Sequence, residues 1–174
     1  QSINARCYWI TGLSASGKST MANMLKDYLK KRNKPVIKLD GDVLRNIFNV
    51  KAYSLEERYQ LGLKFSVLCK LIVENNINVV IGVIGLFHKL HSWNKKNIPN
   101  YCEIFLSVPM KELIHRDPKG IYKKALKGQL KNVMGMDLKV EFPLKPDIEI
   151  TWVTKKKVED TFKEIVKKIN VKPK

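Results

Sequence analysis

A glycine pattern near the start of the chain constrains the fold more than any other feature. Residues 12–19 read Gly-Leu-Ser-Ala-Ser-Gly-Lys-Ser, which is G-x-x-x-x-G-K-S in full. An apolar run at 7–11, typical of a buried strand, precedes the pattern, and a helical apolar period over 18–31 follows it. Because a strand, this loop and a helix in succession are the context of a phosphate-binding P-loop, we predict one here.

The residue types of this loop suit a bound triphosphate. Gly12 and Gly17 let the backbone curl so that N–H groups point inward at the start of the helix. Lys18 supplies a positive charge for the β- and γ-phosphates, and the Ser19 hydroxyl is a ligand for Mg²⁺. We therefore expect ATP to lie against Gly12, Ser14, Ala15, Ser16, Gly17, Lys18, Ser19 and Thr20.

Short apolar runs alternate with amphipathic stretches along the rest of the chain. We expect strands at 7–11, 36–39, 77–84, 103–108 and 147–153, and helices at 18–31, 54–74, after Pro109 and at 158–169. This alternation predicts an α/β fold of three layers, with a central parallel sheet flanked by helices. Residues 1–174 show no linker and no internal repeat, so we predict a single domain.

Residues 117–146 have no clear period and carry several glycines, prolines and lysines. A long segment of this kind in a small domain is usually functional, and we predict a basic lid. Arg116 and Lys119 stand at its start, where closure over phosphates would neutralise the charge that grows on a transferred group. The other lysines of the segment are interpreted as solvated surface charges.

Two carboxylates, Asp40 and Asp42, follow the second predicted strand, whose end we expect to lie beside the P-loop. Carboxylates there can hold metal-bound water and accept a proton from an attacking hydroxyl. The third strand ends at residues 82–85 without an acidic residue, so we assign the metal to Asp40. Acids after the second strand favour a small-molecule kinase over a motor or a switch protein.

The formal charge of +17, from 33 basic and 16 acidic residues, indicates an anionic partner. Phosphorylated small molecules and nucleic acid both fit. Lysines far outnumber arginines, whereas direct reading of bases relies on arginine forks, and an AT-rich genome would also give many lysines. A nucleic-acid-binding module with a relic P-loop stays a remote second hypothesis, and we expect no nucleic-acid partner.

The apolar runs are far shorter than the ~20 residues of a membrane span, and QSINARCYWITG lacks the pattern of a secretion signal. The three cysteines, Cys7, Cys69 and Cys102, are odd in number and far apart, which favours free thiols in a reducing compartment. We expect a cytoplasmic protein without a membrane partner.

The histidines match no metal-ligand spacing. We interpret His88 and His91 as residues of a Lys/Asn-rich loop, either solvated or in contact with substrate, and His115 as structural. The side chains expected in the core include Trp9, Phe65, Cys69, Phe105 and Trp152.

Three blocks, WITGLSASGKST, LDGDVLR and RDPKGIYKKALKG, resemble in order and spacing the signature blocks of adenylylsulfate (APS) kinases. Weaker similarity extends over about residues 8–150. The resemblance implies a P-loop kinase fold, usually a homodimer, that transfers the γ-phosphate of ATP to the ribose 3′-hydroxyl of a small 5′-nucleotide. Lys18 and Ser19 match the family's phosphate and Mg²⁺ positions.

Further roles follow from the resemblance. Asp42 is assigned to the substrate hydroxyl and Asp40 to the metal. Arg45 and Arg58 match arginines that hold the anionic group of the substrate, and Lys119 matches a lysine of the lid.

The departures from the family pattern fall in the pocket for the acceptor's base. Where APS kinases sandwich adenine between two phenylalanines, Tyr53 and Val133 stand here. The family's Asn-Ile-Arg-Arg reads Leu-Gly-Leu-Lys at 61–64, and its Ser-Pro-Phe reads Gly-Leu-Phe at 85–87. One stacking face, worth on the order of 1–3 kcal/mol, is therefore largely lost.

The motif that binds ATP matches the family pattern, whereas the residues of the acceptor's base pocket differ from it. This difference predicts a different nucleotide acceptor. A smaller base such as cytosine suits a pocket with one aromatic wall. Relatives of APS kinase that phosphorylate cytidine diphosphoramidate, in the synthesis of bacterial capsule phosphoramidate, fit this description. We favour that acceptor, and APS itself is the alternative.

Overall fold

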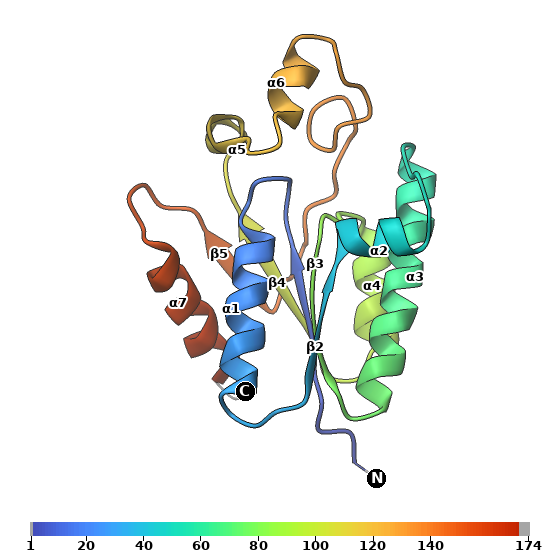
Figure 1. Ribbon diagram of the computed structural model, residues 1–174, viewed down its shortest axis with the longest axis vertical. Helices are drawn as coiled ribbons and strands as arrows, with labels where there is room; N and C mark the ends of the chain where they lie inside the picture. The colour runs from blue at the N-terminus through green and yellow to red at the C-terminus, as the bar shows by residue number, and fades with distance from the viewer. Residues whose placement is uncertain (1, 171–174) are drawn as a thin grey trace.

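The protein is described by a computed structural model, which covers residues 2–170. A single five-stranded sheet carries helices on both faces (Figure 1). The elements in chain order are β1 (Cys7–Thr11), α1 (Lys18–Lys30), β2 (Val36–Asp40), α2 (Gly41–Ile47), α3 (Leu55–Glu74), β3 (Asn78–Val83), α4 (His88–Asn97), β4 (Tyr101–Ser107), α5 (Met110–Arg116), α6 (Ile121–Leu126), β5 (Ile148–Thr151) and α7 (Val158–Asn170). The prediction of a parallel α/β fold is confirmed.

The strand order is β2-β3-β1-β4-β5, and every pair is parallel. The carboxyl ends of all strands therefore meet at one edge, where α5, α6 and the loop after β1 gather (Figure 1). The end of β2 lies beside the P-loop as predicted, with Asp40 3.4 Å from the Ser19 hydroxyl, although β1 and β2 are not adjacent strands. Strand β3 separates them, with Thr11 paired to Val83 and Asp40 paired to Gly82.

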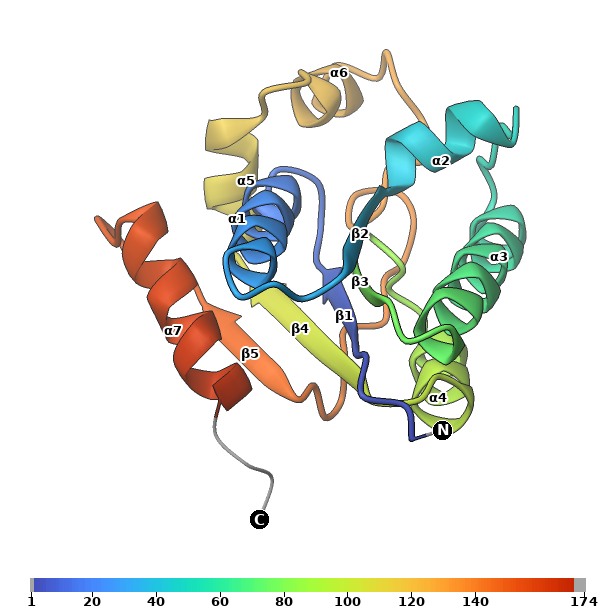
Figure 2. The same ribbon diagram turned by 60° about the horizontal axis from the view of Figure 1, so that its bottom comes forward.

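The two faces of the sheet are covered by different helices. Helices α1 and α7 cover one face, and α3 and α4 cover the other (Figure 2). Side chains alternate along β1, so that Trp9 packs in the cluster beneath α3 while Tyr8 and Ile10 pack beneath α1. Because both faces are buried at the centre of the sheet, β1 and β3 are almost wholly apolar runs without polar alternation, whereas the edge strand β5 alternates buried and exposed residues.

Helix α3 begins as predicted at a capping box. The Ser54 hydroxyl accepts from the Glu57 amide at 3.2 Å, and the Glu57 carboxylate accepts from the Ser54 amide at 2.9 Å. The free cysteines and three of the four core aromatics lie where expected: Cys7, Cys69, Cys102, Trp9, Phe65 and Phe105 are buried. Trp152 is only half-buried, which corrects its assignment to the core.

Helix α4 corrects the interpretation of residues 88–97 as a loop. Its sequence, HKLHSWNKKN, shows no helical period of apolar residues, because the buried face includes the polar residues His91 and Asn94 beside Leu90. His91 is 6% exposed, and its Nε2 lies 2.8 Å from the Gly85 carbonyl oxygen. His88 lies at the helix start, where its backbone amide donates to the Glu141 carboxylate at 2.8 Å. His91 is therefore structural, whereas the side chain of His88 stays 40% exposed.

Helices α2 and α6 were also absent from the predicted elements. Helix α2 begins with a glycine and buries only Leu44, and α6 has six residues within the segment that shows no clear period. Such short elements bury too few side chains to leave a periodic signal. None of the helices within residues 2–170 is both long enough and apolar enough to cross a membrane.

Strand β4 buries one carboxyl group in the sheet. Glu103 is 1% exposed, and the Tyr101 hydroxyl donates to its Oε1 at 3.0 Å. Burial raises the pKa of Glu103 above its ordinary value, although the hydrogen bond from Tyr101 opposes the shift. The ionised carboxylate is therefore disfavoured in the fold.

Replacing Glu103→Gln keeps an acceptor for Tyr101 and removes the ionisable group. A raised pKa in the fold means that Glu103 contributes its stability below its ordinary pKa and loses it as the pH rises through the folded-state pKa. We expect the variant to gain unfolding free energy relative to the wild type between about pH 4.5 and about pH 7, measured by urea denaturation. A difference that stays constant over this range would contradict the assignment.

Candidate active site

The loop between β1 and α1 folds into an anion cradle. A Cβ atom at Gly12 would lie 2.7 Å from the Ser16 hydroxyl and 3.0 Å from the Leu106 carbonyl oxygen, so only glycine fits there. Gly17 adopts φ +97°, and Ala15 takes the left-handed φ of +66° that side chains rarely adopt. These conformations turn successive backbone amides toward one point at the start of α1, the arrangement that binds phosphate.

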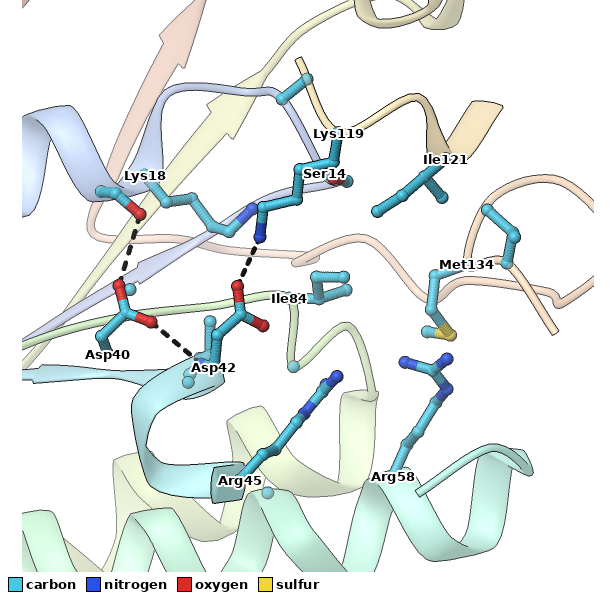
Figure 3. Close-up of a pocket in the computed structure, with 18 of the residues that line it drawn as sticks. Ser14, Lys18, Asp40, Asp42, Arg45, Arg58, Ile84, Lys119, Ile121 and Met134 are labelled. Atoms are coloured by element: carbon cyan, nitrogen blue, oxygen red, sulfur yellow. Dashed lines mark hydrogen bonds and ion pairs between the residues drawn. The ribbon is translucent and has the colours of Figure 1, made fainter. Parts of the chain in front are cut away.

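Lys18 extends from the first turn of α1 into the cradle (Figure 3). Its ammonium group donates to the Leu13 carbonyl oxygen at 2.7 Å. Burial and, to a smaller extent, the nearby charge of Lys119 lower the pKa of Lys18 to about 8. A phosphate group would remove this penalty by supplying negative charge, so the buried ammonium is suited to an anionic ligand.

Ser19 and Asp40 bring two hard oxygen donors together. The Ser19 hydroxyl lies 3.4 Å from Oδ2 of Asp40, while Oδ1 of Asp40 caps α2 by accepting from the Asp42 amide at 2.9 Å. This donor pair fits Mg²⁺, which takes few protein ligands and keeps waters and phosphate oxygens. No group of three or more His, Cys, Asp or Glu side chains gathers as a metal site within residues 2–170.

Asp42 stands in the first turn of α2 and faces the lid. Its Oδ2 pairs with the ammonium of Lys119, which reaches down from the loop before α6 (Figure 3). The hydrogen bond from Lys119 lowers the pKa of Asp42, and burial opposes that shift. Asp42 is therefore ionised at neutral pH, and its carboxylate can accept a proton once Lys119 moves away.

Two arginines point into the same space from α2 and α3 (Figure 3). The Nε of Arg45 is buried and has no hydrogen-bond partner within the described part of the chain. Burial and the neighbouring Arg45 lower the pKa of Arg58. Neither guanidinium group forms a salt bridge with a carboxylate within residues 2–170. Two such groups close together are therefore suited to bind an anion.

A cavity of about 710 Å³ joins these groups, a volume suited to a nucleotide. Tyr53 and Val133 line it as predicted, with Tyr53 54% exposed and Val133 6% exposed. Of the other predicted site residues, the cavity brings together Ser14, Ala15, Gly17, Lys18, Ser19, Thr20, Asp40, Asp42, Arg45, Arg58, Arg116 and Lys119. Gly12 and Ser16 belong to the same loop but do not line this cavity.

A second cavity of about 420 Å³ opens on the other side of the P-loop. It is lined by Ser16 and Thr20, by Arg116, and by Trp152 after β5. Arg116 is held in place, because its Nε donates to Glu112 at 2.7 Å and its Nη1 donates to the Ala15 carbonyl oxygen at 3.3 Å. Sequence reasoning missed the contribution of Trp152, since its apolar neighbours suggested a core position.

Tyr122 is a further residue that sequence reasoning missed. It is fully buried in α6, and its hydroxyl donates to the Ser14 carbonyl oxygen at 2.8 Å. This bond ties the lid segment directly to the phosphate loop. A single tyrosine among lysines gives no periodic signal, so only the three-dimensional contact identifies it.

The comparisons with known proteins agree with this geometry. The profile of the family described as adenylylsulphate kinase matches residues 4–151. The chain belongs to the adenylylsulphate kinase family. It is 36% identical over 166 residues to a cytidine diphosphoramidate kinase of Campylobacter jejuni, covering 95% of this chain and 97% of that one. It is 32% identical to an adenylyl-sulfate kinase of Gloeothece citriformis, covering 81% of each chain.

Solved structures of adenylylsulphate kinases share the fold. The APS kinase of Mycobacterium tuberculosis, solved in complex with AMPPNP and APS, superimposes with a TM-score of 0.88 at 26% identity, covering 96% of this chain and 98% of that one. The predicted family and the P-loop kinase fold are therefore both confirmed. The chain is therefore a kinase of this family.

The lowered pKa of Lys18 gives a test of the cradle. At about pH 8.5 much of the free protein has a neutral Lys18, whereas bound triphosphate favours the ammonium, so ATP binding should take up a proton. Calorimetry in two buffers of different ionisation enthalpy measures this uptake. Lys18→Met should bind ATP at least about tenfold more weakly and take up no proton. Equal proton uptake by the variant would assign the effect to another group.

Proposed function

We propose that this enzyme transfers the γ-phosphate of ATP to the ribose 3′-hydroxyl of cytidine diphosphoramidate. One observation supports it above the others: the phosphate loop and the Asp42 carboxylate open into one cavity whose acceptor wall carries Tyr53 and Val133. The phosphate loop and the Asp42 carboxylate together suit phosphoryl transfer to an alcohol. The wall formed by Tyr53 and Val133 suits a nucleotide with a small base.

The donor's phosphates bind the amides of the P-loop and the ammonium of Lys18. Ser19 and Asp40 would hold Mg²⁺, which would neutralise part of the triphosphate charge. Arg116 and Lys119 come from the lid side and stabilise the charge that grows on the transferred group. The nucleoside of ATP extends into the second cavity, where Arg116 and Trp152 offer flat faces to its base.

Asp42 acts on the acceptor. Its carboxylate lies on the Lys119 side of the large cavity, and it takes the proton of the ribose hydroxyl as the oxygen attacks phosphorus. Lys119 forms an ion pair with this carboxylate. Phosphates in the cradle compete for Lys119, so donor binding releases the base.

The acceptor wall supports cytosine over adenine. Tyr53 offers one exposed aromatic face, but Val133 is aliphatic and Leu61 has no polar atom for a base edge. Arg45 and Arg58 bind the acidic diphosphoramidate end. Near full-length similarity to a cytidine diphosphoramidate kinase at 36% identity supports the same choice.

Adenylylsulfate kinase activity, which makes 3′-phosphoadenylylsulfate, is the second candidate. It is favoured by the close superposition on an APS kinase that was solved with APS bound, at a TM-score of 0.88. The nucleic-acid hypothesis has weaker support, because Lys18, Arg45 and Arg58 line a partly closed cavity whose volume suits a small anionic ligand.

The wider setting of the enzyme follows from the same features. Three buried free thiols support a reducing, cytoplasmic location. Exposed apolar side chains on α2 and α3, Val43, Ile47, Val67 and Leu71, supply apolar surface for the homodimer that the family resemblance implies. A cytidine diphosphoramidate kinase would place the protein in capsule synthesis.

An ADP-release assay with Mg-ATP tests the proposal. Cytidine diphosphoramidate, APS, CMP and AMP are offered separately, and NMR coupling between phosphorus and the ribose proton locates the new phosphate. We expect kcat/KM for cytidine diphosphoramidate to exceed that for APS by about tenfold or more, because one adenine-stacking face is missing. A preference for APS would establish the second candidate, and absence of turnover with every nucleotide would refute both.

Asp42→Asn tests the assigned base in the same assay. Loss of a general base lowers kcat by about 10²–10⁴-fold, while ATP binding measured by calorimetry stays near that of the wild type. Asp160→Asn makes the same chemical change on the exposed face of α7 and serves as the matched control. Near-normal turnover by Asp42→Asn would show that another group takes the proton.

A further inference from the structure

Arg58 makes two hydrogen bonds that the anion-holding role does not require. Its Nε donates to the Tyr53 carbonyl oxygen at 3.1 Å, and its Nη2 donates to the Asn132 carbonyl oxygen at 2.9 Å. Tyr53 precedes α3, whereas Asn132 lies in the lid segment next to Val133. One guanidinium therefore joins the two walls of the large cavity that face the acceptor's base.

Each of these walls is itself a braced turn. The Glu57 carboxylate accepts from the amides of Tyr53 and Ser54, both at 2.9 Å. The Asp137 carboxylate accepts from the amides of Asn132 and Val133, both at 2.6 Å. Because both turns are fixed internally, a bond between them sets the position of one whole wall against the other.

Few other contacts hold the lid to this side of the cavity. The lid segment is fixed to the P-loop by Tyr122 and to the start of α4 by Glu141. Between residues 117–138 and residues 41–74 of the described chain, the polar side-chain contacts are those of Lys119 with Asp42 and of Arg58 with Asn132. Once phosphates draw Lys119 away, Arg58 remains as the polar link.

We propose that Arg58 is a positioning residue, whose bridge between the Tyr53 and Asn132 carbonyls holds the lid wall against the α3 wall and preforms the slot for the acceptor's base. This role adds to the binding of the acceptor's anionic end, which Arg58 shares with the neighbouring Arg45. The proposal rests on the proposed function only in placing a nucleotide acceptor in this cavity.

The experiment separates the bridge from the charge. Arg58→Lys keeps the charge, but a single ammonium cannot replace the planar fork that reaches both carbonyls, and Arg58→Met removes charge and bridge together. Lys124→Gln, on the exposed side of α6, removes one lid charge outside the cavity and is the control. Hydrogen exchange is followed in the ligand-free proteins at the amides of residues 53–54 and 132–136.

We expect both Arg58 variants to exchange faster than the wild type at residues 132–136, by about tenfold, as the loss of one charged hydrogen bond implies. Lys124→Gln should match the wild type. Unchanged exchange in both variants would overturn the bridge. This measurement needs no acceptor, so it stands even where the proposed transfer reaction fails.

Calorimetry with CMP and with cytidine then tests the effect on binding. A bridge predicts that Arg58→Met weakens both ligands by about tenfold and that Arg58→Lys does not recover the affinity for cytidine, which has no anionic end. An anion-holding role alone predicts that cytidine binding is unchanged, and this result would overturn the proposal. A merely stabilising role predicts lower thermal stability with unchanged affinity for both ligands, and that result would overturn it as well.

Discussion

The approach of Ser19 to Asp40 across an intervening strand is the contact on which the site depends. Strands β1 and β2 are not neighbours, yet their ends bring these two side chains within 3.4 Å. Gly82 of β3 lies between the two strand ends, and a Cβ atom there would meet the Cβ of Lys18 at 3.4 Å, an ordinary van der Waals distance. The donor loop and the acidic turn can thus act on one phosphate because parallel strands end at the same edge of the sheet.

An excess of positive charge in a partly closed cavity is the second constraint. Lys18, Lys119, Arg45, Arg58 and Arg116 line the cavity against the two carboxylates of Asp40 and Asp42. Some of these cations have partners within the protein: Lys18 contacts the Leu13 carbonyl oxygen, Lys119 contacts Asp42, and Arg58 contacts the carbonyl oxygens of the cavity walls. Polyphosphate ligands replace such contacts, so binding and the rearrangement of charged side chains are coupled.

The elements that bury continuous apolar surface could be predicted from the sequence. The P-loop could be predicted as well, because its glycine spacing is specific to that structure. The five strands, α1, α3 and α7 belong to this group, as does the capping box at Ser54. Helix α4 was not predicted because the polar residues His91 and Asn94 lie on its buried face. Helices α2 and α6 are too short to show a helical period of apolar residues.

Within the site, side-chain chemistry could be read from the sequence, but contacts to backbone carbonyls could not. The cavity gathers Lys18, Asp40, Asp42 and the arginines that the motifs indicated. The bonds of Tyr122 to Ser14 and of Arg58 to Asn132 join segments 108 and 74 residues apart and use main-chain oxygens, which have no residue-type signal. The position of β3 between β1 and β2 was equally hidden, since strand order depends on how helices cross the sheet.

A crystal structure of the enzyme with Mg²⁺, a non-hydrolysable ATP analogue and a cytidine nucleotide would test the central claim most directly. The account predicts the terminal phosphate against Lys18, and the ribose 3′-hydroxyl within hydrogen-bond distance of Asp42 and directed at that phosphate. A triphosphate outside the P-loop, or an acceptor hydroxyl whose neighbouring carboxylate is not Asp42, would contradict it.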